Sequence, residues 1–164
     1  MVERHDAGDV YRALAPAVLA YLRTQRVAEP EDVLGEVFLH VARDLHRVRG
    51  DDLAVRKWVF TLARNRAVDE ARRWARRPQI ADCPVPEVGA PPPDAGLLDA
   101  ELTDALARLT PEQREVVSLR FVADLPVEAV ARITHRSVGA VKAMQHRAVA
   151  QLAQAVSREA QPTL

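Results

Sequence analysis

The chain has 164 residues, enough for one domain or two small ones. It is 48% hydrophobic and 28% charged, a composition that excludes disorder throughout. Six glycines and 4% aromatic residues favour an all-α fold over a β fold. There is no run of about 18 apolar residues, and charges interrupt the start of the chain, where a signal peptide would be apolar. We therefore expect a cytoplasmic protein with no membrane insertion.

The net charge is zero, but the charges are unevenly distributed along the chain. Residues 54–77 hold eight Lys or Arg against two acids, and residues 129–158 hold five and no acid. Two separate basic stretches are typical of nucleic-acid binding, although a basic run can also be an ordinary solvated helix face.

A proline-rich stretch at residues 78–96 contains six prolines and shows no helical period, which predicts a linker. It divides the chain into a domain at 1–77, the linker at 78–96, a domain at 97–158 and a tail at 159–164. Each domain is large enough for a small helical core. The single cysteine, Cys83, lies in the linker without metal-ligand spacing around it, so we expect no metal and no cofactor.

Apolar residues recur at helical spacing through the first domain and predict three helices. The first covers Val10–Arg23, where Pro16 is expected to bend or shorten it. The second covers Pro30–Leu45, with its proline suited to the first turn. After a loop at Val48–Leu53, in which an aspartate can cap the next helix, the third ends at Arg77.

The second domain begins with a predicted helix at Leu97–Leu109. Thr110 and Gln113 then form a predicted capping box for a helix that reaches about Phe121. A short helix at residues 126–133, a turn, and a long helix from Ser137 through Val156 follow. Two helices joined by such a turn are typical of the helix-turn-helix motif.

Placed at roughly 3.6 residues per turn, the last helix has an apolar arc and an opposite face of small and basic residues. A recognition helix in the DNA major groove needs that combination of close approach and long donors. The predicted duplex-contacting residues are Ser137, Lys142, Ala143, His146 and Arg147. A plain solvated helix of a four-helix bundle is the alternative interpretation.

Four segments together resemble a known family. They are Glu31–Leu39, Trp58–Asp69 with the arginines that follow it, Leu106–Arg120 and Ser137–Ala148. In this order they resemble regions 2 and 4 of sigma-70 family factors of RNA polymerase. Because the resemblance covers only these two regions and a short linker, the chain is similar to the extracytoplasmic-function (ECF) group.

The resemblance implies roles for specific residues. Asp32, Glu36 and Phe38 match the polymerase-binding motif, although core packing is an equal alternative for Phe38. Asn65 and Asp69 match positions that face the −10 strand, and the Val48–Arg56 loop matches a segment that captures a flipped base. The expected phosphate contacts are Arg72, Arg73, Arg76 and Arg77. The implied partners are the β′ clamp helices and β flap of core polymerase, promoter DNA and, commonly in this family, an anti-sigma factor.

Three departures from the family pattern affect the predicted contacts. Gly35 stands where the family usually has Gln, and Ala140 replaces a frequent Thr. Met144-Gln145 replaces a frequent Arg-Leu, so no −35 sequence is predicted.

A stand-alone helix-turn-helix regulator would explain the second domain equally well but leaves Asn65 and its neighbours without a role. We do not expect an enzyme, because the sequence offers no paired acidic metal site, phosphate-binding loop or nucleophile–base set.

Overall fold

The computed structural model describes residues 5–76 and 100–160, and every regular element in these stretches is helical. The first stretch contains α1 (Ala7–Thr24), α2 (Pro30–Asp44), the 3-10 helix η1 (Leu45–Arg47) and α3 (Asp52–Arg76). The second contains α4 (Ala100–Ala107), α5 (Pro111–Val117), the π-helical turn η2 (Ser118–Val122), α6 (Val127–Thr134) and α7 (Val138–Glu159). The predicted all-α fold is confirmed. The predicted linker, Cys83 and Arg77 lie outside the described residues.

α1 begins earlier than its apolar period predicts. The side chain of Asp6 accepts hydrogen bonds from the backbone N–H groups of Gly8 and Asp9, at 2.8 and 3.3 Å, and so caps the first turn. Pro16 lies inside α1, which continues to Thr24, so the predicted shortening does not occur. Pro16 is on the exposed side of the helix, where water can satisfy the carbonyl that loses its partner.

The N-terminal helices α1, α2 and α3 pack on one another through one apolar face each. Tyr21 of α1 and Phe60 of α3 are fully buried and meet edge to face, with ring centroids 5.8 Å apart. Val37 and Val41 supply the buried face of α2. No described helix has the length and apolar character that crossing a membrane would require.

Local capping defines the helices of the C-terminal half. Thr110 accepts from the backbone N–H of Gln113 at 3.2 Å, and the Gln113 side chain accepts from the N–H of Thr110 at 3.3 Å, which confirms the predicted capping box. Arg114 is buried, and its guanidinium donates to the carbonyls of Leu106 and Leu109, both at 3.1 Å. It therefore satisfies carbonyl groups where α4 ends. Burial, and then the nearby charge of Arg26, lowers the pKa of Arg114.

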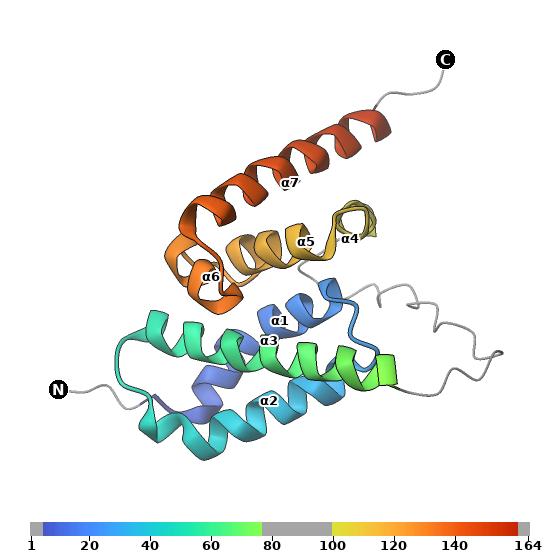
Figure 1. Ribbon diagram of the computed structural model, residues 1–164. Coiled ribbons are helices and arrows are strands. Elements are labelled where there is room, and N and C mark those ends of the chain that lie inside the picture. Colours follow the sequence, from blue (N-terminus) through green and yellow to red (C-terminus); the bar gives the residue numbers. More distant parts are fainter. Residues whose placement is uncertain (1–4, 77–99, 161–164) are drawn as a thin grey trace.

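The two groups of helices lie one above the other in Figure 1, with α1 and α3 facing the C-terminal half. We expected each half to hold its own core. Instead, the core of α1–α3 continues into Val116 of α5 and Leu119 of η2, both of which are fully buried. The predicted linker therefore joins two halves that are packed together in this structure.

Candidate nucleic-acid interface

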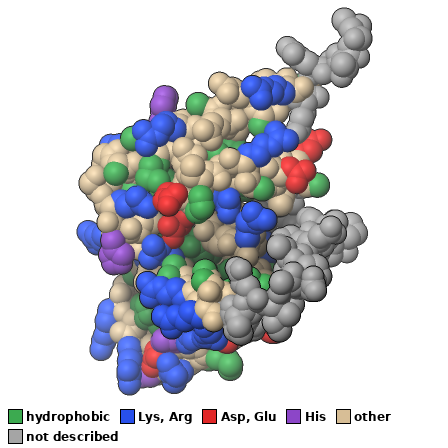
Figure 2. Space-filling view, turned by 45° about the vertical axis from the view of Figure 1, so that its right-hand side comes forward, with side chains coloured by type: hydrophobic (Ala, Val, Ile, Leu, Met, Phe, Trp, Pro, Cys, Tyr) green, Lys and Arg blue, Asp and Glu red, His purple; other side chains and the backbone are tan. Residues whose placement is uncertain are grey.

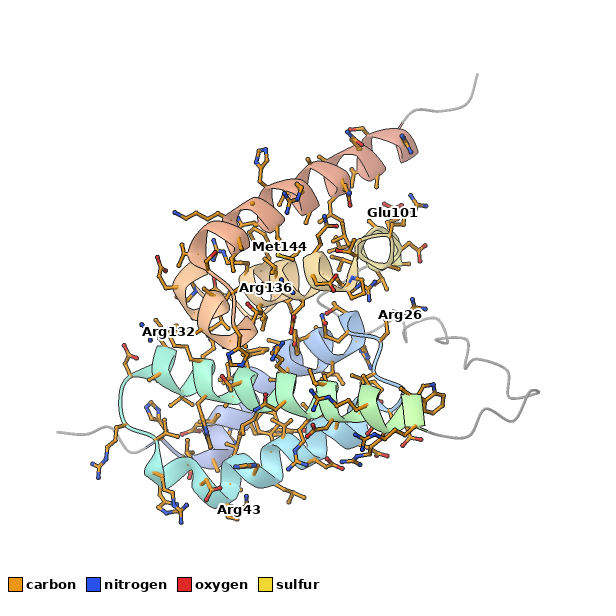
Figure 3. All side chains as sticks on the ribbon, viewed as in Figure 1. Arg26, Arg43, Glu101, Arg132, Arg136 and Met144 are labelled. Carbon is orange, nitrogen blue, oxygen red and sulfur yellow. The ribbon has the colours of Figure 1, made fainter. Side chains whose placement is uncertain are left out.

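α7 presents the face that its sequence predicts. Val141 and Ala148 are fully buried, and Met144 is 9% exposed and points toward α5 (Figure 3). Exposed on the other side of the helix are Gly139, Lys142, Ala143, His146 and Arg147. The exposed face therefore combines small residues with cationic and imidazole donors, as major-groove contact requires.

The predicted contact residue Ser137 has a second role in the structure. It is the N-cap of α7, and its hydroxyl oxygen accepts from the backbone N–H of Ala140 at 3.1 Å. Its own O–H group remains a donor for an outside acceptor. Because the start of a helix also favours negative charge, this end of α7 suits a phosphate group.

Two further cations were missed as individual site residues, although both were counted in the basic stretch. Arg132 of α6 and Arg136 of the turn before α7 are both exposed, and Arg132 projects from α6 in Figure 3. In helix-turn-helix proteins the first helix crosses the DNA backbone, so cations at these positions suit phosphates.

The long helix α3 carries the second predicted face. Asn65, Asp69, Arg72 and Arg76 are exposed and fall along one stripe at helical spacing, with exposed Arg73 beside it. Arg73 lies 3.9 Å from the carboxylate of Glu70, which is a weak surface pair. In Figure 2, Lys and Arg side chains gather on the lower half of the molecule, where the N-terminal helices lie.

The loop before α3 has a defined shape. Gly50 has a φ of 126°, and a Cβ added there would lie 2.7 Å from Cβ of Ala54, so only glycine fits. Asp51 caps α3 by accepting from the N–H of Ala54 at 3.0 Å, as predicted for an aspartate in this loop. His5 contacts the loop from the other side, 3.4 Å from both Asp52 Oδ1 and the carbonyl oxygen of Gly50. Backbone geometry, a cap and a neighbouring side chain therefore hold the loop.

Of the three α2 residues that match the polymerase-binding motif, two are exposed and the third, Phe38, is buried. Asp32 and Glu36 are exposed on one side, together with Arg43, which projects from the lower side of α2 in Figure 3. Phe38 is only 9% exposed and packs edge to face on Tyr11, with ring centroids 4.9 Å apart.

Leu39, in contrast, is 74% exposed and shares the stripe of Asp32 and Glu36. Helical spacing alone identifies Leu39 as the neighbour of Glu36, because that spacing places Phe38 on the opposite side of α2. Glu36 lies 3.5 Å from Arg66 of α3, so the exposed faces of α2 and α3 adjoin.

Charged pairs join the two halves of the molecule. Nε of Arg64 on α3 donates to Oε1 of Glu115 on α5 at 2.5 Å, and their side chains are only 19% and 14% exposed. Nearby, burial raises the pKa of Tyr21, the negative charge of Glu115 raises it further, and Arg64 opposes this. A second, more exposed pair joins Arg56 to Asp124 at 3.3 Å.

The arrangement offers binding surfaces on three helices. Among the described residues, no group of His, Cys, Asp or Glu side chains is placed to hold a metal ion. A helix-turn-helix unit with a basic reading face, packed on a bundle with a second basic helix, defines a DNA-binding protein of two helical halves.

Comparisons with known proteins identify the family. The family model of Sigma-70 region 2 matches residues 10–77, and that of Sigma-70, region 4 matches residues 99–152. The chain is 32% identical over 176 residues to the ECF RNA polymerase sigma factor BldN of Streptomyces coelicolor, covering 98% of this chain and 66% of BldN. It is 31% identical over 144 residues to the RNA polymerase sigma factor CarQ of Myxococcus xanthus, covering 85% of this chain and 82% of CarQ. The chain therefore belongs to the sigma-70 family of transcription initiation factors, in its ECF group.

Solved structures share the fold. The sigma factor RpoE, in complex with the anti-sigma factor NepR from Bartonella quintana, matches with a TM-score of 0.77 at 22% identity, covering 92% of this chain and 96% of that chain. CnrH, in complex with the cytosolic domain of CnrY, matches with a TM-score of 0.65 at 20% identity, covering 94% and 89%. At these identities the likeness supports the fold alone.

Proposed function

We propose that the protein binds core RNA polymerase in the cytoplasm through the exposed face of α2 and directs it to promoters, without catalysing a reaction itself. In this proposal α7 reads the −35 duplex, and α3 with the loop before it captures the melted −10 strand. The α2 contact uses Asp32, Glu36 and Leu39, where two carboxylates and one apolar side chain suit a partner with basic residues around an apolar pocket.

The observation that carries this proposal is the stripe of Asn65 and Asp69 followed by arginines on α3. A single strand has bases without pairing partners, and polar side chains can hydrogen-bond their edges while arginines bind the phosphates. The loop at Gly50 suits the same task, because a segment already held in one conformation needs no reordering when an extruded base binds to it. An ordinary duplex-binding regulator has no use for this second face.

The two packed halves must separate before the protein can bind the −35 and −10 elements at the same time. A 164-residue globule has a diameter of about 40 Å, from the usual scaling of radius of gyration with length. The −35 and −10 elements are centred about 25 base pairs apart, which is about 85 Å of duplex. The form in which Arg64 contacts Glu115 is therefore a closed state, and binding to polymerase opens it. An anti-sigma factor is a further proposed partner, because the sigma factor RpoE, of similar fold, forms such a complex.

The test combines Asn65→Ala with Asp69→Ala. We expect the double variant to assemble with core polymerase normally and to fail in forming the open complex on closed duplex. A template already melted across the −10 element should restore part of the activity, because unpairing then costs nothing. Permanganate reactivity of −10 thymines measures the opening. Normal thymine reactivity on closed duplex would refute strand capture by this face.

A further inference from the structure

The junction between η2 and α7 contains a polar contact at one of the positions where the sequence departs from its family. The guanidinium of Arg120 donates from Nε to Oε1 of Gln145 at 3.1 Å and from Nη1 to the carbonyl oxygen of Leu125 at 2.7 Å. Leu125 is fully buried and lies in the turn before α6, and Gln145 is half-buried on α7. We call these three residues the Arg120 fork.

From the fork we infer that Arg120 is a positioning residue for −35 recognition, setting the rotation of α7 about its own axis through Gln145. The inference rests on the proposed function and deepens it. Arg120 itself lies in η2 and is not on the exposed face of α7, so it acts through another residue rather than by touching DNA.

The position of Gln145 on α7 supports this role. At helical spacing, Gln145 lies at the border between the buried side, with Val141 and Ala148, and the exposed side, with Lys142. A contact at the border resists rotation more directly than one at the centre of the buried face. Among the buried side chains nearby, Ala148 is small and Met144 adapts its shape, so these two hold the rotation less firmly.

The backbone aims the arginine at its two acceptors. η2 is a π-helical turn, in which the N–H of Ala123 bonds to the carbonyl of Ser118 at 2.9 Å. Such a turn inserts one residue into the α-helical register and shifts the direction of the side chains after it. The hydroxyl of Ser118, the first residue of this turn, is fully buried and has no hydrogen-bond partner among the described residues. This irregular turn therefore persists despite an unsatisfied polar group, and it places Arg120 within hydrogen-bond distance of Leu125 and Gln145.

The geometric demand is strict. Side-chain tips lie roughly 5–6 Å from a helix axis, so a rotation of about 10° moves them by about 1 Å. Recognition geometry tolerates deviations of roughly 0.5 Å. A small rotation of α7 would therefore displace Lys142, His146 and Arg147 beyond that tolerance while leaving the fold intact.

The experiment uses holoenzyme assembled from the full chain and core polymerase. Selection from a random duplex pool first gives the preferred −35 sequence, which is then the probe against a scrambled duplex. Arg120→Lys keeps the charge but loses the forked donor geometry, and Gln145→Leu removes the acceptor. Each change should lower the ratio of specific to non-specific binding about tenfold, with an unchanged salt slope because no phosphate contact is lost.

The double variant decides between positioning and independent contacts. If Arg120 acts through Gln145, the double variant should also lose about tenfold, because both changes remove the same interaction. An additive loss of about a hundredfold, or no loss in either single variant, would overturn the inference. Arg108→Lys, in the exposed turn after α4, and Gln151→Leu, at an exposed position of α7, are matched controls and should leave the ratio unchanged.

Two further measurements distinguish a loss of the Arg120 contact from misfolding and from failure of the proposed function. Thermal unfolding reports on folding, and Gln145→Met replaces Gln145→Leu if the leucine variant unfolds early; the same non-additive loss is expected. If wild-type holoenzyme selects no −35 sequence at all, the proposed function fails. If it selects one that both single variants bind equally well, only the role of Arg120 fails.

Discussion

Replacing Glu115 with glutamine should loosen the contact between the two halves of the molecule. Glu115 of α5 accepts from Nε of Arg64 of α3 at 2.5 Å, and the two side chains are only 14% and 19% exposed. Glutamine keeps the shape and an acceptor oxygen but removes the charge. The change therefore tests the ion pair and leaves the surrounding packing of Tyr21 in place.

The expected magnitude follows from the burial of the pair. A fully exposed ion pair contributes about 0.2–1 kcal/mol, and breaking a fully buried pair costs about 3–5 kcal/mol. The Arg64–Glu115 pair lies between these limits, so its loss should cost the closed state about 1–3 kcal/mol. That is about a 5–150-fold shift of the equilibrium from the closed state toward the open state.

Fluorescence energy transfer between the halves measures this shift. In a Cys83→Ala background, dyes at Ala13→Cys on α1 and Gln154→Cys on α7 occupy exposed positions. Energy transfer should fall in the Glu115→Gln variant and should stay unchanged in a control at exposed Glu112→Gln. Equal transfer in wild type and Glu115→Gln, with normal helical content, would refute the role of the pair in closure.

Further predictions concern α2 and the two exposed helical glycines. Leu39→Asp should weaken assembly with core polymerase by roughly tenfold or more at unchanged unfolding temperature. Phe38→Ala should instead lower the free energy of unfolding by about 3–5 kcal/mol. Size-exclusion chromatography with core polymerase measures assembly, and denaturant unfolding measures stability, so the two effects can be told apart. Unimpaired assembly of Leu39→Asp would contradict the assignment of Leu39 to the polymerase contact. Gly35→Ala and Gly139→Ala should each stabilise by about 1 kcal/mol, because nothing lies within 4 Å of an added Cβ. Only Gly139→Ala should also weaken −35 binding, measured by duplex competition, since it adds a methyl group to the exposed side of α7 that is proposed to face DNA.

Features set by neighbouring residues could be predicted from the sequence. The capping box of Thr110 and Gln113 needs only four consecutive residues, and the structure contains it. The exposed face of α7 depends on helical spacing alone, and burial of Val141 and Ala148 confirms its phase. The same spacing would have placed Leu39, rather than Phe38, beside Glu36. The family motif matches Phe38, whereas helix geometry places that side chain on the buried side of α2.

Features set by packing between distant segments could not be predicted. The start of α5 reads as an ordinary amphipathic helix, yet its continuation from Ser118 is a π-helical turn that packs against α1. The choice between α and π register there depends on contacts with a helix about a hundred residues away, which no local pattern records. The core shared by the two halves was also unpredictable from local sequence. Leu119 is buried in one continuous core because the two halves contact each other.

The closed state leaves every proposed recognition face accessible. Asp32 and Leu39 on α2, Asn65 on α3 and Lys142 on α7 are all exposed while Arg64 contacts Glu115. Closure therefore leaves these four residues free to make contacts, although it engages Arg56 of the proposed base-capturing segment, which pairs with Asp124 at 3.3 Å. What it restricts is the distance between the −10 and −35 faces, because about 40 Å of protein cannot span about 85 Å of duplex. It follows that closure should weaken simultaneous binding to both elements far more than binding to either one. A partner that stabilises the closed state would then inhibit promoter recognition without covering the exposed residues proposed to contact DNA.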